Sequence, residues 1–300
     1  MPDQTDDRVF RWERPAPVGE PPRRVVSLVP SLTESLFDLD LGDRLIAITS
    51  YCVRPADRVQ LLPKVGGTKN PDIELIIRLK PDLVLLNDEE NRREDAAALQ
   101  SAGIPIWVTG PRTVHDAINV LWNIMDIFDH PVMVPRVHEI ERACDYTLGA
   151  SLADEPVRVF APIWRDPWMT FNADTYAHDV LRVCGGANVF AERERQFPLA
   201  ADLGQAEALP PDDPRVAGHD RRYPRITLDE VIAARPEVVL LPDEPYAFAG
   251  DDVQLFREMD IPAAHDERIY LIDGSLLTWH GTRLAYALRD LPGLLARESS

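Results

Sequence analysis

Short apolar runs alternate with amphipathic segments along most of the chain. A short apolar run bounded by turn residues is typical of a buried strand, whereas apolar residues three and four positions apart are typical of a helix. The runs predict strands at residues 24–29, 45–49, 83–86, 105–108, 157–161, 238–241 and 269–272. Strands that alternate with helices in this way predict an α/β fold with parallel sheets and helices on both faces.

Local motifs predict where two of the helices begin. Residues 31–34, Ser-Leu-Thr-Glu, have the S-x-x-E form of a capping box, and that helix should end at Gly42. Residues 70–72, Asn-Pro-Asp, should start another helix, because proline at a helix start loses no hydrogen bond. Pro81 should end that helix, because proline cannot continue it.

One internal repeat is visible. Residues 72–86 align without a gap with residues 227–241, at a constant offset of 155 positions. The apolar positions, the basic residue before proline, the proline and the acid after it all match. The repeat indicates two related lobes, although convergence on a common helix–strand pattern is the alternative.

The segments around the repeat complete the expected organisation. Residues 114–153 have helical spacing interrupted at residues 130–131, which predicts two helices, the second long enough to link two lobes. Residues 193–225 are rich in Pro, Asp and Arg and predict a long surface loop. The expected domains are an N-terminal extension at 1–23 with a short β segment at 9–12, an N-terminal lobe at 24–127, a linking helix at 128–153, and a C-terminal lobe at 154–300.

Composition and charge exclude several classes of protein. The 300 residues are 45% hydrophobic and carry a formal net charge of −18, which makes nucleic acid an improbable partner since phosphate binding needs a basic face. No apolar run is long enough to span a membrane. The three cysteines are far apart, so neither a zinc site nor a disulfide framework is indicated. The N-terminal residues lack the apolar segment of a secretory signal, so we expect a cytoplasmic chain as written, with an upstream start codon as the alternative. We also expect a monomer.

Unusual side chains follow several of the expected strands. In parallel α/β sheets, ligands bind beyond the carboxyl ends of the strands. The residues at these positions are Tyr51, Cys52, Asn87, Glu89, Glu90, Trp164, Arg165, Trp168, Trp279 and His280. Flat aromatic walls with one cation suit a large planar ligand. The alternatives are that the tryptophans fill the core, that the acids after Asn87 only begin a helix, and that His280 is structural.

The chain lacks the common catalytic motifs. It has no G-x-S-x-G elbow, no Walker loop and no G-x-G-x-x-G fingerprint. Its seven histidines do not form H-x-x-x-H, so no resident metal or intrinsic cofactor is expected. No nucleophile–base pair is recognisable, and we therefore expect a binding protein and not an enzyme.

Four motifs resemble a known family. They are RVVSLVPSLTE at 24–34, VGGTKNP at 65–71, LKPDLV at 79–84 and VCGGANV at 183–189. In order and spacing they resemble the cobalamin- and iron-siderophore-binding family of ABC-importer substrate-binding proteins, over about residues 8 to 293. The resemblance implies two Rossmann-like lobes joined by a single long backbone helix, roughly residues 131–152, with the ligand in the cleft between the lobes.

The resemblance also implies roles for individual residues. Glu74 and Asp229, equivalent in the repeat, would dock on arginines of the membrane permease, although both also suit a first helical turn. Thr68 and Asn87 lie where a cobalamin carrier of the family has tryptophans, and Tyr223 lies where another aromatic is expected. Trp279 replaces an arginine of that carrier.

These features lead to one main functional hypothesis. The chain would capture a corrinoid, a cobalamin-like ligand, for an ABC-type importer. Trp164, Trp168, Tyr223 and Trp279 would stack on the ligand, Arg165 would pair with a negative or carbonyl group, and Asn87, Glu90 and His280 would supply hydrogen bonds. The alternatives are an iron-siderophore, heme or metal receptor on the same fold, and a cytoplasmic corrinoid-handling protein or enzyme that works without a transporter. The family would imply a periplasmic or cell-surface location.

Overall fold

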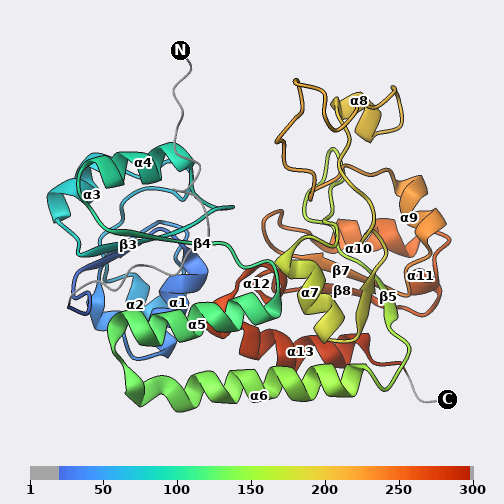
Figure 1. Ribbon diagram of the computed structural model, residues 1–300. Helices are drawn as coiled ribbons and strands as arrows, with labels where there is room; N and C mark the ends of the chain where they lie inside the picture. Colours follow the sequence, from blue (N-terminus) through green and yellow to red (C-terminus); the bar gives the residue numbers. More distant parts are fainter. Residues whose placement is uncertain (1–19, 298–300) are drawn as a thin grey trace. The chain divides into compact units, whose positions relative to one another are not determined.

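The computed structural model describes residues 20–297, in which strands and helices alternate (Figure 1). The strands are β1 (Val25–Ser27), β2 (Leu45–Ile48), β3 (Leu83–Asn87), β4 (Ile106–Thr109), β5 (Val157–Phe160), β6 (Gly186–Asn188), β7 (Val238–Pro242) and β8 (Ile269–Ile272). The β segment expected at residues 9–12 lies outside the described residues.

Helices connect these strands. They are α1 (Pro30–Asp38), α2 (Ala56–Val59), α3 (Ile73–Leu79), α4 (Arg93–Ser101), α5 (Val114–Phe128), α6 (Val134–Ser151), α7 (Tyr176–Val183), α8 (Leu199–Asp202), α9 (Leu228–Ala234), α10 (Gly250–Arg257), α11 (Pro262–His265), α12 (Ser275–Thr278) and α13 (Leu284–Leu295). Short 3₁₀ turns occupy Gly42–Arg44, Pro131–Met133 and Gly281–Arg283.

The strands form two four-stranded parallel sheets, in the orders β2-β1-β3-β4 and β6-β5-β7-β8. The chain divides into two compact units. The first unit comprises the residues up to Pro111, His115–Arg142 and Trp279–Leu284, and the second comprises Arg112–Val114, Ala143–Thr278 and the residues from Ala285 onward. The long helix α6 begins in the first unit and ends in the second. These findings confirm the predicted α/β class with two parallel sheets, and the expected domain boundaries stay predictions.

Each sheet has its own apolar core. In the first unit, Val26, Val84 and Val108 on the strands pack with Ile76 of α3 and Leu99 of α4. The equivalent core of the second unit is built by the residues Phe160, Val239, Ile269, Val231 of α9 and Phe256 of α10. Because α3, α4, α9 and α10 bury one apolar face each, the strand ends are held in fixed positions.

The internal repeat is visible in three dimensions. The helix before the repeated strand begins at Asp72 in the first unit, where the carboxylate accepts a hydrogen bond from the backbone of Leu75, and at Thr227 in the second, where the hydroxyl accepts one from Glu230. Both helices end at a basic residue in the left-handed conformation, Lys80 and Arg235. The two sheets also share one strand order, which convergence on a single helix–strand pattern does not require.

In each repeat, an arginine at or directly before the start of a neighbouring strand donates to the last carbonyls of the helix. Nη2 of Arg24 donates to the carbonyl of Leu79 at 2.6 Å, and Arg158 donates to the carbonyl of Ala234. In both units the last carbonyls of a helix therefore receive a cation, which is favourable at the negative end of the helix dipole.

Some expectations about the elements are wrong. Ser31 is not a cap, because α1 begins one residue earlier and its N-cap, Val29, makes no side-chain bond. The helix ends at Asp38 and not at Gly42, since the chain turns through the left-handed Asp40. Pro71 precedes the cap residue of α3 instead of lying inside the helix.

Candidate functional site

The acidic turn after β3 is built around two buried asparagines. The side-chain oxygen of Asn87 accepts hydrogen bonds from the backbone of Glu89 at 2.8 Å and Glu90 at 3.2 Å. Asn91 accepts from the backbone of Asn87 at 2.8 Å and donates to the carbonyl of Thr68 at 2.9 Å. Both amides therefore fix the turn, which leaves Glu89 and Glu90 half-buried at its surface.

The loop after β2 lies next to this turn. Nζ of Lys69 donates to the carbonyl of Glu89 at 2.6 Å, which joins the two loops. The ring of Tyr51 is 62% exposed and lies against Gly67, where an added Cβ would be 3.3 Å from the ring. Tyr51, Thr68 and Glu89 thus belong to one continuous edge of the first sheet.

Cys52 is at the same edge but is buried. Its sulfur accepts a hydrogen bond from the hydroxyl of Thr33 at 3.1 Å and lies 3.3 Å from that of Thr49. Burial raises the pKa of the Cys52 thiol, so it stays protonated and unreactive at neutral pH.

Trp279 and His280 belong to a segment that returns to the first unit from far along the chain. Nδ1 of His280 lies 3.3 Å from the hydroxyl of Ser31, and Nε of Arg283 donates to Glu34 at 2.9 Å. The guanidinium groups of Arg54 and Arg283 lie over the Trp279 ring, 5.9 and 5.8 Å from its centre. Trp279 is consequently only 8% exposed.

Burial shapes the charge state of this cluster. His280 is 3% exposed, and burial lowers its pKa to about 4, so the imidazole is neutral at neutral pH. Burial also raises the pKa of Glu34, an effect that the charge of Arg283 opposes.

The carboxyl edge of the second sheet is aromatic. Trp164, after β5, is 44% exposed and meets Tyr246 edge to face at 5.6 Å. Trp168 stacks on Phe248 at 5.8 Å and contacts the core residue Phe256 at 5.4 Å. Because Tyr246 and Phe248 are themselves 4.7 Å apart, the rings form one series from the surface to the core, each pair contributing about 1 kcal/mol.

The cation expected beside this wall is already paired. Nη1 of Arg165 donates to Asp252 at 2.5 Å, and the carboxylate of Asp252 is nearly fully buried. Asp252 also accepts from the backbone of Ala249 at 2.9 Å, so it caps α10. The guanidinium of Arg165 lies 5.6 Å from the centre of the Trp168 ring.

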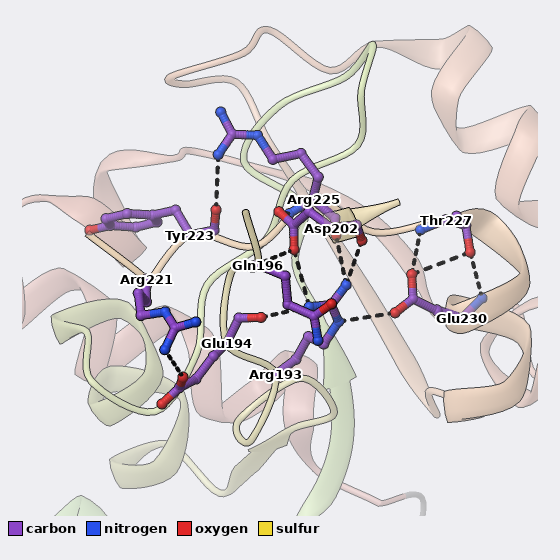
Figure 2. A network of polar contacts seen from close by, with 9 residues as sticks. All are labelled: Arg193, Glu194, Gln196, Asp202, Arg221, Tyr223, Arg225, Thr227 and Glu230. Atoms are coloured by element: carbon purple, nitrogen blue, oxygen red, sulfur yellow. Dashed lines mark hydrogen bonds and ion pairs between the residues drawn. The ribbon is translucent and has the colours of Figure 1, made fainter. Parts of the chain in front are cut away.

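Tyr223 lies in a segment that pairs with the loop after β5. Thr170 donates to the carbonyl of Pro224 at 3.1 Å, and Ile226 donates to that of Trp168 at 2.9 Å. Figure 2 shows the polar contacts that hold this segment, centred on Arg193. Arg193 bonds to Asp202 and Glu230 at 3.1 Å each, which joins the loop to the start of α9.

The structure therefore assembles the predicted residues in each unit separately. Tyr51, Cys52, Thr68, Asn87, Glu89, Glu90, Trp279 and His280 belong to the first unit, and Trp164, Arg165, Trp168 and Tyr223 belong to the second. Their roles in ligand binding stay predictions.

Sequence analysis missed Tyr246 and Phe248, which extend the aromatic wall. They follow β7, the repeat partner of β3. The internal repeat is the signal that could have identified them, because the loop after β7 lies 155 positions beyond the acidic turn after β3.

Glu74 and Asp229 occupy equivalent surface positions. Each is an exposed acid in the first turn of its helix, α3 or α9. One turn further along lie Ile77 and Ile232, which are 38% and 37% exposed. Each unit thus presents an acid next to an apolar side chain.

The second unit also contains a groove of about 770 Å³. Tyr146 of α6, Leu288 of α13 and Val157 at the start of β5 line it. Because Trp164 follows the other end of β5, the groove is separate from the aromatic wall.

Across residues 20–297 no group of three or more His, Cys, Asp or Glu side chains is arranged to hold a metal ion. None of the described helices is long and apolar enough to cross a membrane.

Known proteins resemble this chain in sequence and fold. A family model described as periplasmic binding protein matches residues 25–120. The vitamin B12-binding protein of Vibrio parahaemolyticus is 26% identical over 256 residues, which cover 85% of this chain and 82% of that protein.

Two solved structures have the same fold. The periplasmic heme-binding protein RhuT from Roseiflexus sp. RS-1 in apo form has a TM-score of 0.71 and 22% identity, covering 91% of this chain and 97% of that one. The periplasmic vitamin B12 binding protein BtuF of Vibrio cholerae has a TM-score of 0.71 and 21% identity, covering 92% and 97%. The family match, the sequence relative and the shared fold agree: residues 25–120 match the periplasmic binding protein family, and the chain has the fold of periplasmic binding proteins over most of its length.

Proposed function

We propose that this chain is the substrate-binding protein of an ABC-type importer and that it captures a corrinoid. The observation that carries the proposal is the aromatic wall of the second unit, in which Trp164 and Tyr246 offer ring faces and edges at the surface. A corrin is a large, flat, mostly apolar ring, and stacked aromatic side chains bind such rings at low cost in side-chain entropy.

The surroundings of the wall support the same class of ligand. Trp168 and Phe248 anchor the exposed rings to the core, so the surface is preformed. Tyr223 lies in the neighbouring segment. Within the first unit, Asn87 and His280 hold loops in position.

Heme is the second candidate. It is also a flat chelate, and the similar protein RhuT is named as a heme-binding protein. Two half-buried arginines near Tyr223, Arg195 and Arg225, favour a ring that carries acidic groups.

Glu74 and Asp229 are the proposed contacts with a permease. Both acids are exposed and lie one turn from an exposed isoleucine, a combination suited to a mixed polar and apolar interface.

Replacing Trp164 tests the ligand. We expect Trp164→Ala to weaken binding of cyanocobalamin at least about tenfold, because the exposed ring of the wall is lost. Isothermal calorimetry and the visible absorbance of the corrin measure the affinity. Tyr146→Ala is the matched control, since Tyr146 is exposed on α6 away from the wall.

Two results would count against the corrinoid. If the unaltered protein binds hemin but not cyanocobalamin, heme replaces the corrinoid as the ligand. Equal affinity for cyanocobalamin in Trp164→Ala and the parent would remove the wall from the binding surface. Trp279→Ala is a poorer probe, because that ring is buried and its loss should also lower the Tm.

A further inference from the structure

The loop between β6 and α9 concentrates arginines in an otherwise acidic chain. Residues 193–225 contain six of them, whereas the whole chain has a net charge of −18. Four of the six are paired with carboxylates: Arg193 with Asp202 and Glu230, Arg215 with Asp213, Arg221 with Glu194, and Arg222 with Asp220. Among residues 20–297, Arg195 and Arg225 have no such ion pair.

Arg225 is held in place but incompletely satisfied. Its backbone donates to Asp202 at 2.7 Å, and its Nη1 donates to the carbonyl of Tyr223 at 3.3 Å. Its Nε is buried, and no hydrogen-bond partner for it occurs in the described part of the chain. Figure 2 shows the guanidinium directed away from Asp202 and Glu230, whose carboxylates face Arg193.

Arg195 brings a second positive charge to the same place. Its backbone donates to the carbonyl of Arg221 at 2.8 Å, and its guanidinium lies 4.6 Å from the centre of the Phe197 ring. Both arginines are half-buried. Burial, followed by the charge of Arg195, lowers the pKa of Arg225. Two like charges that are partly withdrawn from water repel each other, and an anion bound between them would offset that cost.

The segment that carries Arg225 is next to the aromatic wall. Arg225 pairs with Met169 in an antiparallel bridge, and Met169 pairs with Trp164. A guanidinium presents a planar set of donors that matches the two oxygens of a carboxylate or phosphate. Arg165, expected to play this part, is already neutralised by Asp252.

We propose that Arg195 and Arg225 form a subsite for an oxyanion on the rim of the ligand, while the ring stacks on the aromatic wall. The subsite rests on the proposed function, and it adds that the ligand carries a negative group. The oxyanion has two sources among flat chelates: the propionate carboxylates of heme, or the phosphodiester of cobalamin.

Four probes separate these sources. Hemin and cyanocobalamin carry the oxyanion, whereas hemin dimethyl ester and dicyanocobinamide lack it. We expect the parent protein to bind one charged probe at least about tenfold more tightly than its uncharged partner, the loss expected for a charge-assisted hydrogen bond. Preference for hemin identifies carboxylates, and preference for cyanocobalamin identifies the phosphodiester.

The double variant Arg195→Gln/Arg225→Gln should lose that preference and keep its affinity for the uncharged probe. Its dissociation constant should also be insensitive to salt, whereas that of the parent should rise with ionic strength. Arg215→Gln is the matched control, because Arg215 belongs to the same loop but is exposed and paired with Asp213. Arg195→Gln alone serves if the double variant does not fold, since the described contacts of that guanidinium are with the Phe197 ring.

The outcomes distinguish the subsite from the function. If the parent binds a charged probe and the double variant binds it equally well, the subsite is wrong and the proposed function stands. If the parent binds both members of each pair with equal affinity, the subsite is likewise wrong and the proposed function stands. If the parent binds none of the four probes, the proposed function fails and the subsite fails with it.

Discussion

Burial changes the acid–base behaviour of single side chains in this protein. His280 has a pKa of about 4 in the folded chain, against an ordinary value of 6.5. Between these values the unfolded chain binds a proton that the folded chain does not, so stability falls as the pH falls through this window. The burial that makes His280 a neutral partner for Ser31 therefore makes the first unit sensitive to acid.

Replacing His280 by glutamine tests this sensitivity to acid. Between pH 6.5 and pH 4, the free energy of unfolding of the parent should drop by up to about 3 kcal/mol more than that of the variant. The Tm measured by calorimetry across this range tests it. His178 has a lowered pKa of the same sign and is present in both proteins, so only the difference between them is informative. Parallel pH profiles would contradict the assignment.

Single residues also show where sequence reasoning ends. Trp164 was predicted to lie after a strand, and it does, because its position depends on the local pattern. Whether Trp279 binds a ligand or fills the core was left open by the sequence, since its burial depends partly on Arg54, which lies 225 positions earlier in the chain. Ser31 looked like a helix cap, but its hydroxyl lies by His280, 249 positions away.

Among the elements, the strands were the easiest to predict. Strands buried on both faces, such as β3 and β7, appear as continuous apolar runs. Strand β6 was missed because Gly186, Ala187 and Asn188 form no such run, and its pairing with β5 defines it instead. Pairing with another segment thus defines strands that the local hydrophobic pattern does not predict.

The caps of the repeated helices allow a test at this scale. Asp72→Ala and Thr227→Ala should each lower the stability of their own unit by about 1 kcal/mol, because each removes the bond to a free backbone N–H group. Thr227→Ser keeps the hydroxyl and should be near neutral. Calorimetry measures the effects, and an alanine variant as stable as the parent would show that its cap contributes nothing.

For the whole molecule, the paired surface positions of the two units make the clearest prediction. The double variant Glu74→Arg/Asp229→Arg should abolish stimulation of the importer's ATPase and leave ligand affinity unchanged, since both acids lie on exposed first turns. ATPase activity of the reconstituted importer, with and without the binding protein, measures this effect.

A control variant shows whether the effect depends on positions 74 and 229 or on the reversal of charge alone. Glu94→Arg reverses another exposed first-turn acid, on α4, and should stimulate the ATPase like the parent. If Glu74→Arg/Asp229→Arg also stimulates normally, the permease contacts a different surface.

Because residues 279–284 return to the first unit, that unit can be completed only late in synthesis. Glu34 and Arg283 form a buried ion pair, and the backbone of Thr282 donates to the hydroxyl of Ser35 at 3.1 Å, so part of the cover of α1 comes from residues 247 positions further along the chain. Synthesis must therefore proceed 247 positions beyond Ser35 before that contact can form. The first unit therefore cannot be completed until most of the second unit has been made, and a chain that stalls before Trp279 leaves the buried carboxylate of Glu34 without Arg283.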